Sequence, residues 1–157
     1  MPATPADRPP LSAADVAQAL AAALETQSQE YALGGAIALG YWGAPRGTID
    51  VDLTIFLPPE QPSQCIGLLQ EIGCNVDAAA ARRSLEEDGF CQVHYQGVRV
   101  DVFLPIVVFY EQARRRRRRV RLGEQTVAIW DAETLAVFKM MFFRRKDLAD
   151  VEQMLRT

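Results

Sequence analysis

The sequence predicts an α+β fold, because stretches with strand periodicity and stretches with helical periodicity follow one another along most of the chain. Polar and apolar side chains alternate over residues 48–57 and again over residues 98–104. Gln96-Gly97 separates the second stretch from a strand-like run at 90–95, and this favours a two-residue hairpin. Nearly half of the 157 residues are hydrophobic, which is enough for one buried core.

The chain is expected to begin with a tail and a capped helix. Residues 1–10 contain four prolines and are predicted to be disordered, so a single domain is assigned to residues 11–157. Ser12 and Asp15 have the spacing of a capping box, which predicts a helix that ends near residue 25 or 27. Prolines and glycines mark the later breaks. The next elements are expected to be a strand at 31–33, a helix at 36–41, the strand at 48–57, a helix at 62–72, a short strand at 74–76 and a helix at 78–87.

The last third is expected to contain two hairpins and three helical segments. The strands at 90–95 and 98–104 form the first hairpin, and Pro105 ends it. A helix or helical turn follows at 106–113, and a shorter hairpin at 120–130. Asp131 is expected to cap a helix that ends at residue 142 or 143, and the final helix is expected at 146–155.

Two carboxylates share one face of the strand predicted at 48–57. Side chains alternate along a strand, so Asp50 and Asp52 point to one side and the apolar residues between and after them point toward a core. Neighbouring carboxylates raise one another's pKa unless a cation lies between them. Divalent cations such as Mg²⁺ are bound by oxygen ligands of this kind, together with the phosphates of a nucleotide. The alternative is a solvated strand face.

A third carboxylate, Asp101, lies in the strand predicted at 98–104. Arg99, Asp101 and Phe103 take one face of this strand, and its valines take the other. With the two strands side by side, the three aspartates converge on a site for two ions and in-line displacement at phosphorus. The alternative is a charge on an edge strand. An unpaired buried carboxylate costs several kcal/mol, so the apolar setting favours a partner.

These residues resemble the nucleotidyltransferase superfamily typified by DNA polymerase beta. The motif is a glycine pair, a segment with two acids, and a third acid in a later strand: Gly34-Gly35, Arg46-x-Thr48-x-Asp50-Val-Asp52 and Asp101. With a late Lys-Asp-x-x-Asp helix at 146–150, the chain is most similar to the small bacterial nucleotidyltransferases grouped with the AbiEii-type toxins. The resemblance covers about residues 30–155 and implies a mixed β-sheet flanked by helices.

The resemblance also implies a reaction, the transfer of a nucleoside monophosphate from an NTP to a hydroxyl. The catalytic and metal-binding residues would be Asp50, Asp52 and Asp101, with two Mg²⁺ ions that Mn²⁺ can replace. The nucleotide-binding residues would be Gly34, Gly35, Arg46, Thr48 and Lys139, with Lys139 favoured over Lys146. Many superfamily members have a serine in this glycine corner, whereas Gly35-Ala36 offers no hydroxyl. This departure leaves open a catalytically inactive member that binds a nucleotide or a partner.

The acceptor stays open, and the arginine run at 114–119 bears on it. Together with Arg121 it holds seven of the 17 basic residues, which leaves ten basic against 20 acidic residues elsewhere. The run is interpreted as a solvated or disordered segment, a contact to RNA, or a contact to the triphosphate or an acidic partner chain. A module that binds nucleic acid without the aspartates is a third hypothesis. Superfamily relatives modify RNA ends, proteins or antibiotics, and AbiEii-like members resemble toxins of toxin-antitoxin systems; RNA is slightly favoured, tRNA first.

The remaining features predict a cytoplasmic protein. The chain has no apolar run of about 18 residues, as a membrane span requires, and its amino terminus lacks the apolar core of a signal peptide. Three cysteines without a C-x-x-C pair indicate buried reduced thiols rather than a zinc site or disulfides. His94 is expected to be structural. So short a chain is expected to need a homodimer or a cognate partner protein to complete the site.

Overall fold

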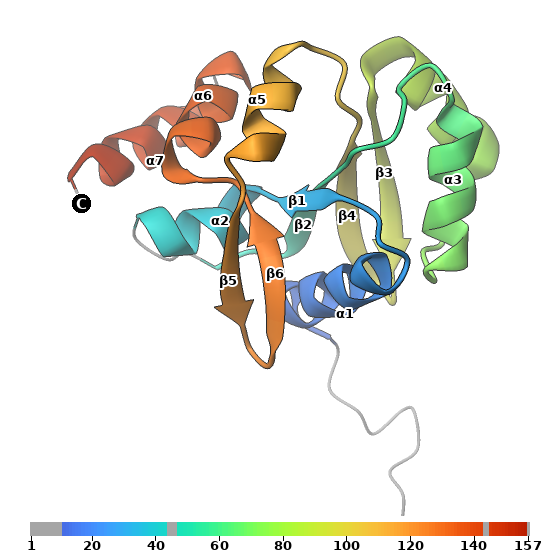
Figure 1. Ribbon diagram of the computed structural model, residues 1–157, viewed down its shortest axis with the longest axis horizontal. Helices are drawn as coiled ribbons and strands as arrows, with labels where there is room; N and C mark the ends of the chain where they lie inside the picture. The colour runs from blue at the N-terminus through green and yellow to red at the C-terminus, as the bar shows by residue number, and fades with distance from the viewer. Residues whose placement is uncertain (1–10, 44–46, 143–144, 157) are drawn as a thin grey trace, which may run out of the picture.

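The computed structural model describes residues 11–43, 47–142 and 145–156, which form a six-stranded mixed sheet with flanking helices (Figure 1). The helices are α1 (Ala13–Thr26), α2 (Gly35–Trp42), α3 (Pro62–Glu71), α4 (Ala78–Asp88), α5 (Phe109–Arg115), α6 (Ala132–Phe142) and α7 (Arg145–Arg156). The strands are β1 (Tyr31–Leu33), β2 (Asp50–Ile55), β3 (Phe90–Tyr95), β4 (Val98–Phe103), β5 (Arg118–Leu122) and β6 (Gln125–Ile129). None of the helices in these ranges is long and apolar enough to cross a bilayer.

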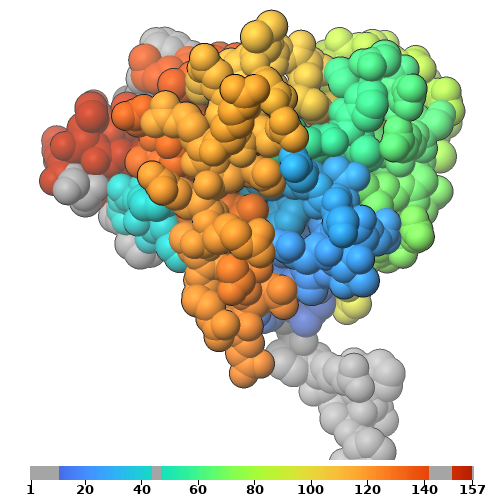
Figure 2. Space-filling view, viewed as in Figure 1, coloured from blue at the N-terminus to red at the C-terminus, as the bar shows by residue number. Residues whose placement is uncertain are grey.

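The strand order is β3-β4-β2-β1-β6-β5. Two hairpins, β3–β4 and β5–β6, form the two ends of the sheet, and both were expected from their turns. The central pairs mix directions: β2 is antiparallel to β1 and parallel to β4, and β1 is parallel to β6. Figure 2 shows that the β5–β6 hairpin projects from the body of the molecule. The α+β class with a mixed sheet flanked by helices is therefore confirmed.

The core lies against one face of the sheet. The apolar residues that alternate with the acids, Val51 and Leu53 in β2 and Val100 and Val102 in β4, are fully buried there. The same hydrophobic cluster contains the apolar faces of α1 and α3. The three cysteines belong to it as free thiols, and burial raises the pKa of Cys65 to about 12. The opposite face of β2 and β4 carries Asp50, Asp52, Thr54, Arg99, Asp101 and Phe103.

Local signals place most helix ends. The capping box of α1 forms as expected, with the Asp15 amide donating to Ser12 Oγ over 3.1 Å and the Ser12 amide donating to Asp15 Oδ2 over 3.0 Å. The short strand predicted at 74–76 is wrong. Asn75 forms only an isolated bridge with His94, because the chain turns away at Asp77, which caps α4. The tail predicted at residues 1–10 lies outside the described residues.

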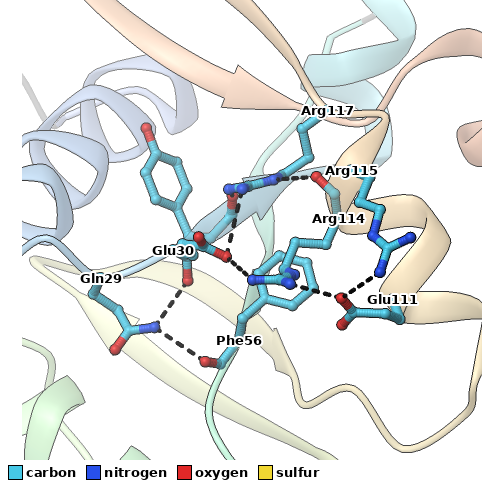
Figure 3. Close-up of polar contacts among 8 residues, drawn as sticks. Gln29, Glu30, Phe56, Glu111, Arg114, Arg115 and Arg117 are labelled. Atoms are coloured by element: carbon cyan, nitrogen blue, oxygen red, sulfur yellow. Dashed lines mark hydrogen bonds and ion pairs between the residues drawn. The ribbon is translucent and has the colours of Figure 1, made fainter.

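The arginine segment at 114–119 is part of the framework and runs from the last turn of α5 into β5. Its arginines pair with acids from separate parts of the chain (Figure 3). Arg114 Nη1 lies 2.7 Å from Glu30 Oε2, and Arg116 Nε lies 3.0 Å from Asp131 Oδ2. The expectation of a disordered run is therefore wrong for these residues.

Arg117 is partly buried, with its side chain 20% exposed. Its guanidinium donates to the carbonyl oxygens of Tyr31 over 2.7 Å and Arg114 over 2.8 Å. It also lies over the ring of Phe56, 5.2 Å from the centroid. Burial lowers the pKa of Arg117, which is the cost that these contacts offset. The side chain joins α5 and β5 to the centre of the sheet.

We expect Arg117→Ala to destabilise the fold by about 2 kcal/mol, because two partly buried carbonyl groups lose a charged donor and Phe56 loses a cation–π contact. Urea denaturation followed by circular dichroism measures this. Arg115, whose side chain is 74% exposed, provides the control within the same run. Arg115→Ala should stay within about 0.5 kcal/mol of the wild type. Equal effects of the two substitutions would contradict a structural role for Arg117.

Candidate functional site

The register of three strands arranges the polar face of the sheet in rows. β2 pairs with β4, and β4 with β3, so that residues from the three strands lie side by side. The charged row contains Asp50, Arg99 and His94; the acidic row contains Asp52, Asp101 and Gln92; the aromatic row contains Thr54, Phe103 and Phe90. Adjacent rows are two residues apart, which is about 6.6 Å along a strand. The predicted adjacency of the aspartates is thus present in the structure.

The glycine corner, Gly34-Gly35, lies against Asp52 on the side of β1. The Gly34 amide donates to the Asp52 carbonyl over 3.0 Å, and α2 begins at Gly35. Gly35 has a φ of +56°, and a Cβ there would lie 2.0 Å from Asp52 Oδ2. Glycine is therefore required at this position, both for its backbone conformation and for the space that the carboxylate takes. The first turn of α2 presents its amides next to the acidic row.

Arg99 lies between two of the predicted metal ligands. Its Nη2 pairs with the carboxylate of Asp50, and its Nε lies 3.4 Å from Asp101 Oδ1. The guanidinium therefore supplies positive charge beside these carboxylates. The sequence placed Arg99 on the same face as Asp101, but its pairing with Asp50 depends on the register between strands that are 49 residues apart.

Asp101 is a partly buried carboxylate whose pKa is raised. Burial raises the pKa of its carboxyl group, the guanidinium of Arg99 lowers it, and the charge of Asp50 raises it again. The net direction is upward because desolvation is the largest effect. Asp101 Oδ1 is buried and receives no hydrogen bond. An unsatisfied buried carboxylate oxygen is suited to bind a cation or to take a proton.

The donor chemistry of the acidic row fits a hard divalent cation, since Asp52 and Asp101 supply adjacent carboxylates and one of their oxygens is unsatisfied. The three aspartates do not form one ligand set as they stand. Within the described ranges, no group of three His, Cys, Asp or Glu side chains is arranged to hold a metal. Asp50 is paired with Arg99 instead.

The predicted nucleotide-binding residues differ in their surroundings. The Thr48 hydroxyl donates to the Asp50 carbonyl over 2.8 Å and so supports the start of β2. Arg46 lies outside the described residues. Lys139 is only 6% exposed, and its Nζ donates to Asp150 Oδ2 over 2.9 Å. The packing of α7 on α6 brings Asp150 to Lys139. The side chain of Lys146 is not among those described.

A cavity of about 490 Å³ opens over the acidic and aromatic rows. The glycine corner, Asp52, Asp101 and Lys139 line it. Its other lining includes five aromatic side chains, Phe90, Phe103, Tyr110, Trp130 and Phe138. This size and this mixture of apolar walls with a few polar groups are typical of a small-molecule site. Sequence reasoning missed the aromatic lining, although Phe103 shares a face with Asp101 and could have indicated it.

Comparison with known proteins relates the fold to one class of proteins. No family model matches the chain, and a search of curated proteins found no match. Among solved structures, a nucleotidyltransferase-like protein from Paracoccidioides brasiliensis is similar with a TM-score of 0.53 and 20% identity, over 94% of this chain and 78% of that one. A lincomycin-bound lincosamide antibiotic adenylyltransferase is similar with a TM-score of 0.56 and 11% identity, over 83% and 89%.

A third similar structure is an antibiotic-resistance factor in complex with adenylyl-2″-tobramycin, with a TM-score of 0.57 and 12% identity, over 88% of this chain and 84% of that one. At such identities the likeness concerns the fold. The described residues thus have the fold of nucleotidyltransferase-like proteins, as the sequence motif implied.

We expect Gly35→Ala to destabilise the fold by about 1 to 2 kcal/mol, because the new methyl group meets the Asp52 carboxylate and φ is positive. Gly40, in the middle of α2, has open space around the position of a Cβ. Gly40→Ala is therefore the matched control, and we expect it to stabilise the helix by about 0.5 to 1 kcal/mol. Chemical denaturation compares the two. A Gly35→Ala variant as stable as the wild type would refute the close approach.

We expect Asp101→Asn to be more stable than the wild type at pH 7 in EDTA. The raised pKa of Asp101 means that its stability contribution is present below the ordinary aspartate pKa and is lost as pH rises through the folded value. The asparagine variant lacks that loss, and its melting temperature should exceed the wild type's by about 2 to 4 °C, as about 1 kcal/mol produces in a domain of this size. The difference should vanish at low pH. Equal melting temperatures of the two proteins at pH 7 would contradict this prediction.

Proposed function

We propose that this protein is a metal-dependent nucleotidyltransferase, which moves a nucleoside monophosphate from an NTP to a hydroxyl and releases pyrophosphate. The observation that carries the proposal is the side-by-side placement of Asp52 and Asp101 on parallel strands, next to the glycine corner that opens α2. Acids beside a set of backbone amides suit the transfer of a phosphoryl group, since such reactions depend on positioning and on charge stabilisation.

In this proposal Asp52 and Asp101 hold Mg²⁺, with Asp50 as a further ligand when Arg99 releases it; two ions are expected, and Mn²⁺ can substitute. The bound metal would supply positive charge for the phosphates and for the attacking oxygen.

The protein's own groups would position the nucleotide and move the proton. The amides in the first turn of α2 would bind phosphate, as helix N-termini do, whereas the Gly34 amide already donates to the Asp52 carbonyl. Lys139 and the predicted Arg46 and Thr48 would bind the same phosphates, with Asp150 holding the Lys139 ammonium in place. Asp101, on the side of the metal nearest the acceptor, would help to deprotonate the attacking hydroxyl. Asp101 Oδ1 is the atom we assign to receive the acceptor's proton.

The acceptor class is open in this proposal. A hydroxyl of RNA, with tRNA first, or of a protein follows from the sequence motif, as do the closeness to AbiEii-type proteins and a role in a toxin-antitoxin pair. A small hydroxylated molecule joins them, because two proteins of similar fold are antibiotic-modifying factors. The internal ion pairs of Arg114, Arg116 and Arg117 weaken the RNA hypothesis, since those charges already have partners.

The second candidate function is a catalytically inactive member that binds a nucleotide or a partner protein. Two observations favour it: Asp50 is paired with Arg99, and Gly35-Ala36 lacks a hydroxyl for a phosphate. A homodimer or a cognate partner protein is the expected way in which either form of the site would be completed.

Replacement of one acid tests the proposal. Asp52→Asn should reduce transfer of label from an α-labelled NTP by at least about 100-fold, because phosphoryl transfer depends on the charge of this row. The assay uses Mg²⁺ and acceptor pools of RNA, protein and small molecules, and it also follows pyrophosphate. Glu87→Gln, which removes one charge from the exposed face of α4, serves as the control. Undiminished transfer by Asp52→Asn would refute the assignment.

Calorimetry with Mg·NTP separates the two candidate functions. Wild-type protein that binds the nucleotide but releases no pyrophosphate with any pool would support the inactive alternative.

A further inference from the structure

We infer that the acceptor presents its hydroxyl on an aromatic ring, which lies on Phe103 and Phe90 next to the acidic row. The inference rests on the proposed function and names the acceptor class for the same site. It comes from the order of side chains on the sheet: acids in one row and aromatic rings in the next, on the same face of the same strands.

The two rings of the aromatic row lie at a fixed distance from the acids and are tilted at 44° to each other. Phe90 and Phe103 pair across β3 and β4, and their ring centroids are 5.0 Å apart. Both line the cavity that contains Asp52 and Asp101. Because Phe103 follows Asp101 by two residues, the ring surface begins about 6.6 Å from the acid along the strand. A ring on this surface can direct a substituent oxygen toward Asp101.

Helices supply a second aromatic wall to the cavity. Tyr110 of α5 and Phe138 of α6 line it, and their ring centroids are 4.9 Å apart. Offset or edge contacts between aromatic rings stabilise an apolar ring bound among them beyond the burial of its area. A cavity of about 490 Å³ also has to receive part of the NTP, so the remaining space suits one small ring system.

The direction of the reaction assigns the aromatic row to the acceptor. In an in-line displacement the attacking oxygen lies opposite the leaving pyrophosphate. The glycine corner, which would hold the leaving phosphates, ends β1 on one side of β2. β4 and β3, with Asp101, Phe103 and Phe90, lie on the other side. The acceptor therefore approaches across the aromatic row.

Shape and proton chemistry favour a phenol over the hydroxyl of an RNA end. A nucleoside places a sugar between its base and its hydroxyl, whereas a phenol carries the oxygen on the ring itself. A phenolic hydroxyl also has a pKa of about 10, so a carboxylate base removes its proton more readily than that of a sugar.

The step is a substitution at the α-phosphorus. The phenolic oxygen forms a bond to this phosphorus while its proton passes to Asp101 Oδ1. The bond between the α-phosphorus and the oxygen that bridges to the β-phosphate breaks, and the electron pair leaves with pyrophosphate. The product is an aryl ester of the nucleoside monophosphate, and no oxidant or reductant is consumed.

A binding experiment tests the ring surface without chemistry. The probes are 4-ethylphenol and its saturated counterpart 4-ethylcyclohexanol, titrated by NMR saturation transfer into wild-type protein, Phe103→Leu and Phe109→Leu. Phe109 packs on Phe138 and is not among the residues that line the cavity, so it is the matched control. We expect 4-ethylphenol to bind about fivefold more weakly to Phe103→Leu and unchanged to Phe109→Leu. Equal binding of both probes, or no effect of Phe103→Leu, would overturn the inference.

A transfer experiment separates this inference from the proposed function. Wild-type protein, Mg²⁺ and α-labelled NTP are offered 4-ethylphenol, a tyrosine-containing peptide, 4-ethylcyclohexanol or an RNA oligonucleotide. Label on the phenol or the peptide supports the inference, and their ratio tells whether the ring belongs to a small molecule or to a protein side chain. Label only on RNA or on the saturated alcohol would overturn it and leave the nucleotidyltransferase in place. If no acceptor is labelled and no pyrophosphate is released, both the nucleotidyltransferase activity and the phenolic acceptor are contradicted.

Discussion

The parallel pairing of β2 with β4 is the constraint on which the site depends. It sets Asp52 opposite Asp101 while Val51 and Leu53 lie beside Val100 and Val102 in the core. A shift of one residue would turn every side chain of one strand to the other face and bury an acid among apolar groups. The core therefore fixes the site, because the burial of these apolar residues stabilises the same strand register that places the two carboxylates side by side.

Holding carboxylates together has an electrostatic cost, and Arg99 offsets part of it. The burial of Asp101 raises its pKa even with the guanidinium beside it, so the row keeps an excess of unfavourable negative charge. A site in that condition gains from any further cation or proton. This excess negative charge destabilises the fold at neutral pH, and it also suits the acidic row to bind a cation or to accept a proton.

The sequence allowed most of this to be predicted where the signal was local. Alternation predicted β2 and β4, and the turn at Gln96-Gly97 predicted the hairpin of β3 with β4. The glycine corner was predicted from its motif, whereas its close approach to Asp52 depends on the tertiary fold. Long-range partners were missed. Composition alone suggested a solvated or disordered arginine run, yet its acidic partners come from elements that only the tertiary fold brings near, and the Lys139–Asp150 pair likewise depends on how α7 packs on α6.

Strand geometry also explains why the acids and the aromatic surface can act as one unit. Residues two apart on a strand keep their spacing whatever the loops do, so the distance from Asp101 to Phe103 is as rigid as the sheet. Tyr110 of α5 and Phe138 of α6 also line the cavity, and their rings contact each other. In the proposed reaction, the strands would therefore fix where an acceptor's hydroxyl lies, and the two helices would determine which rings fit the cavity.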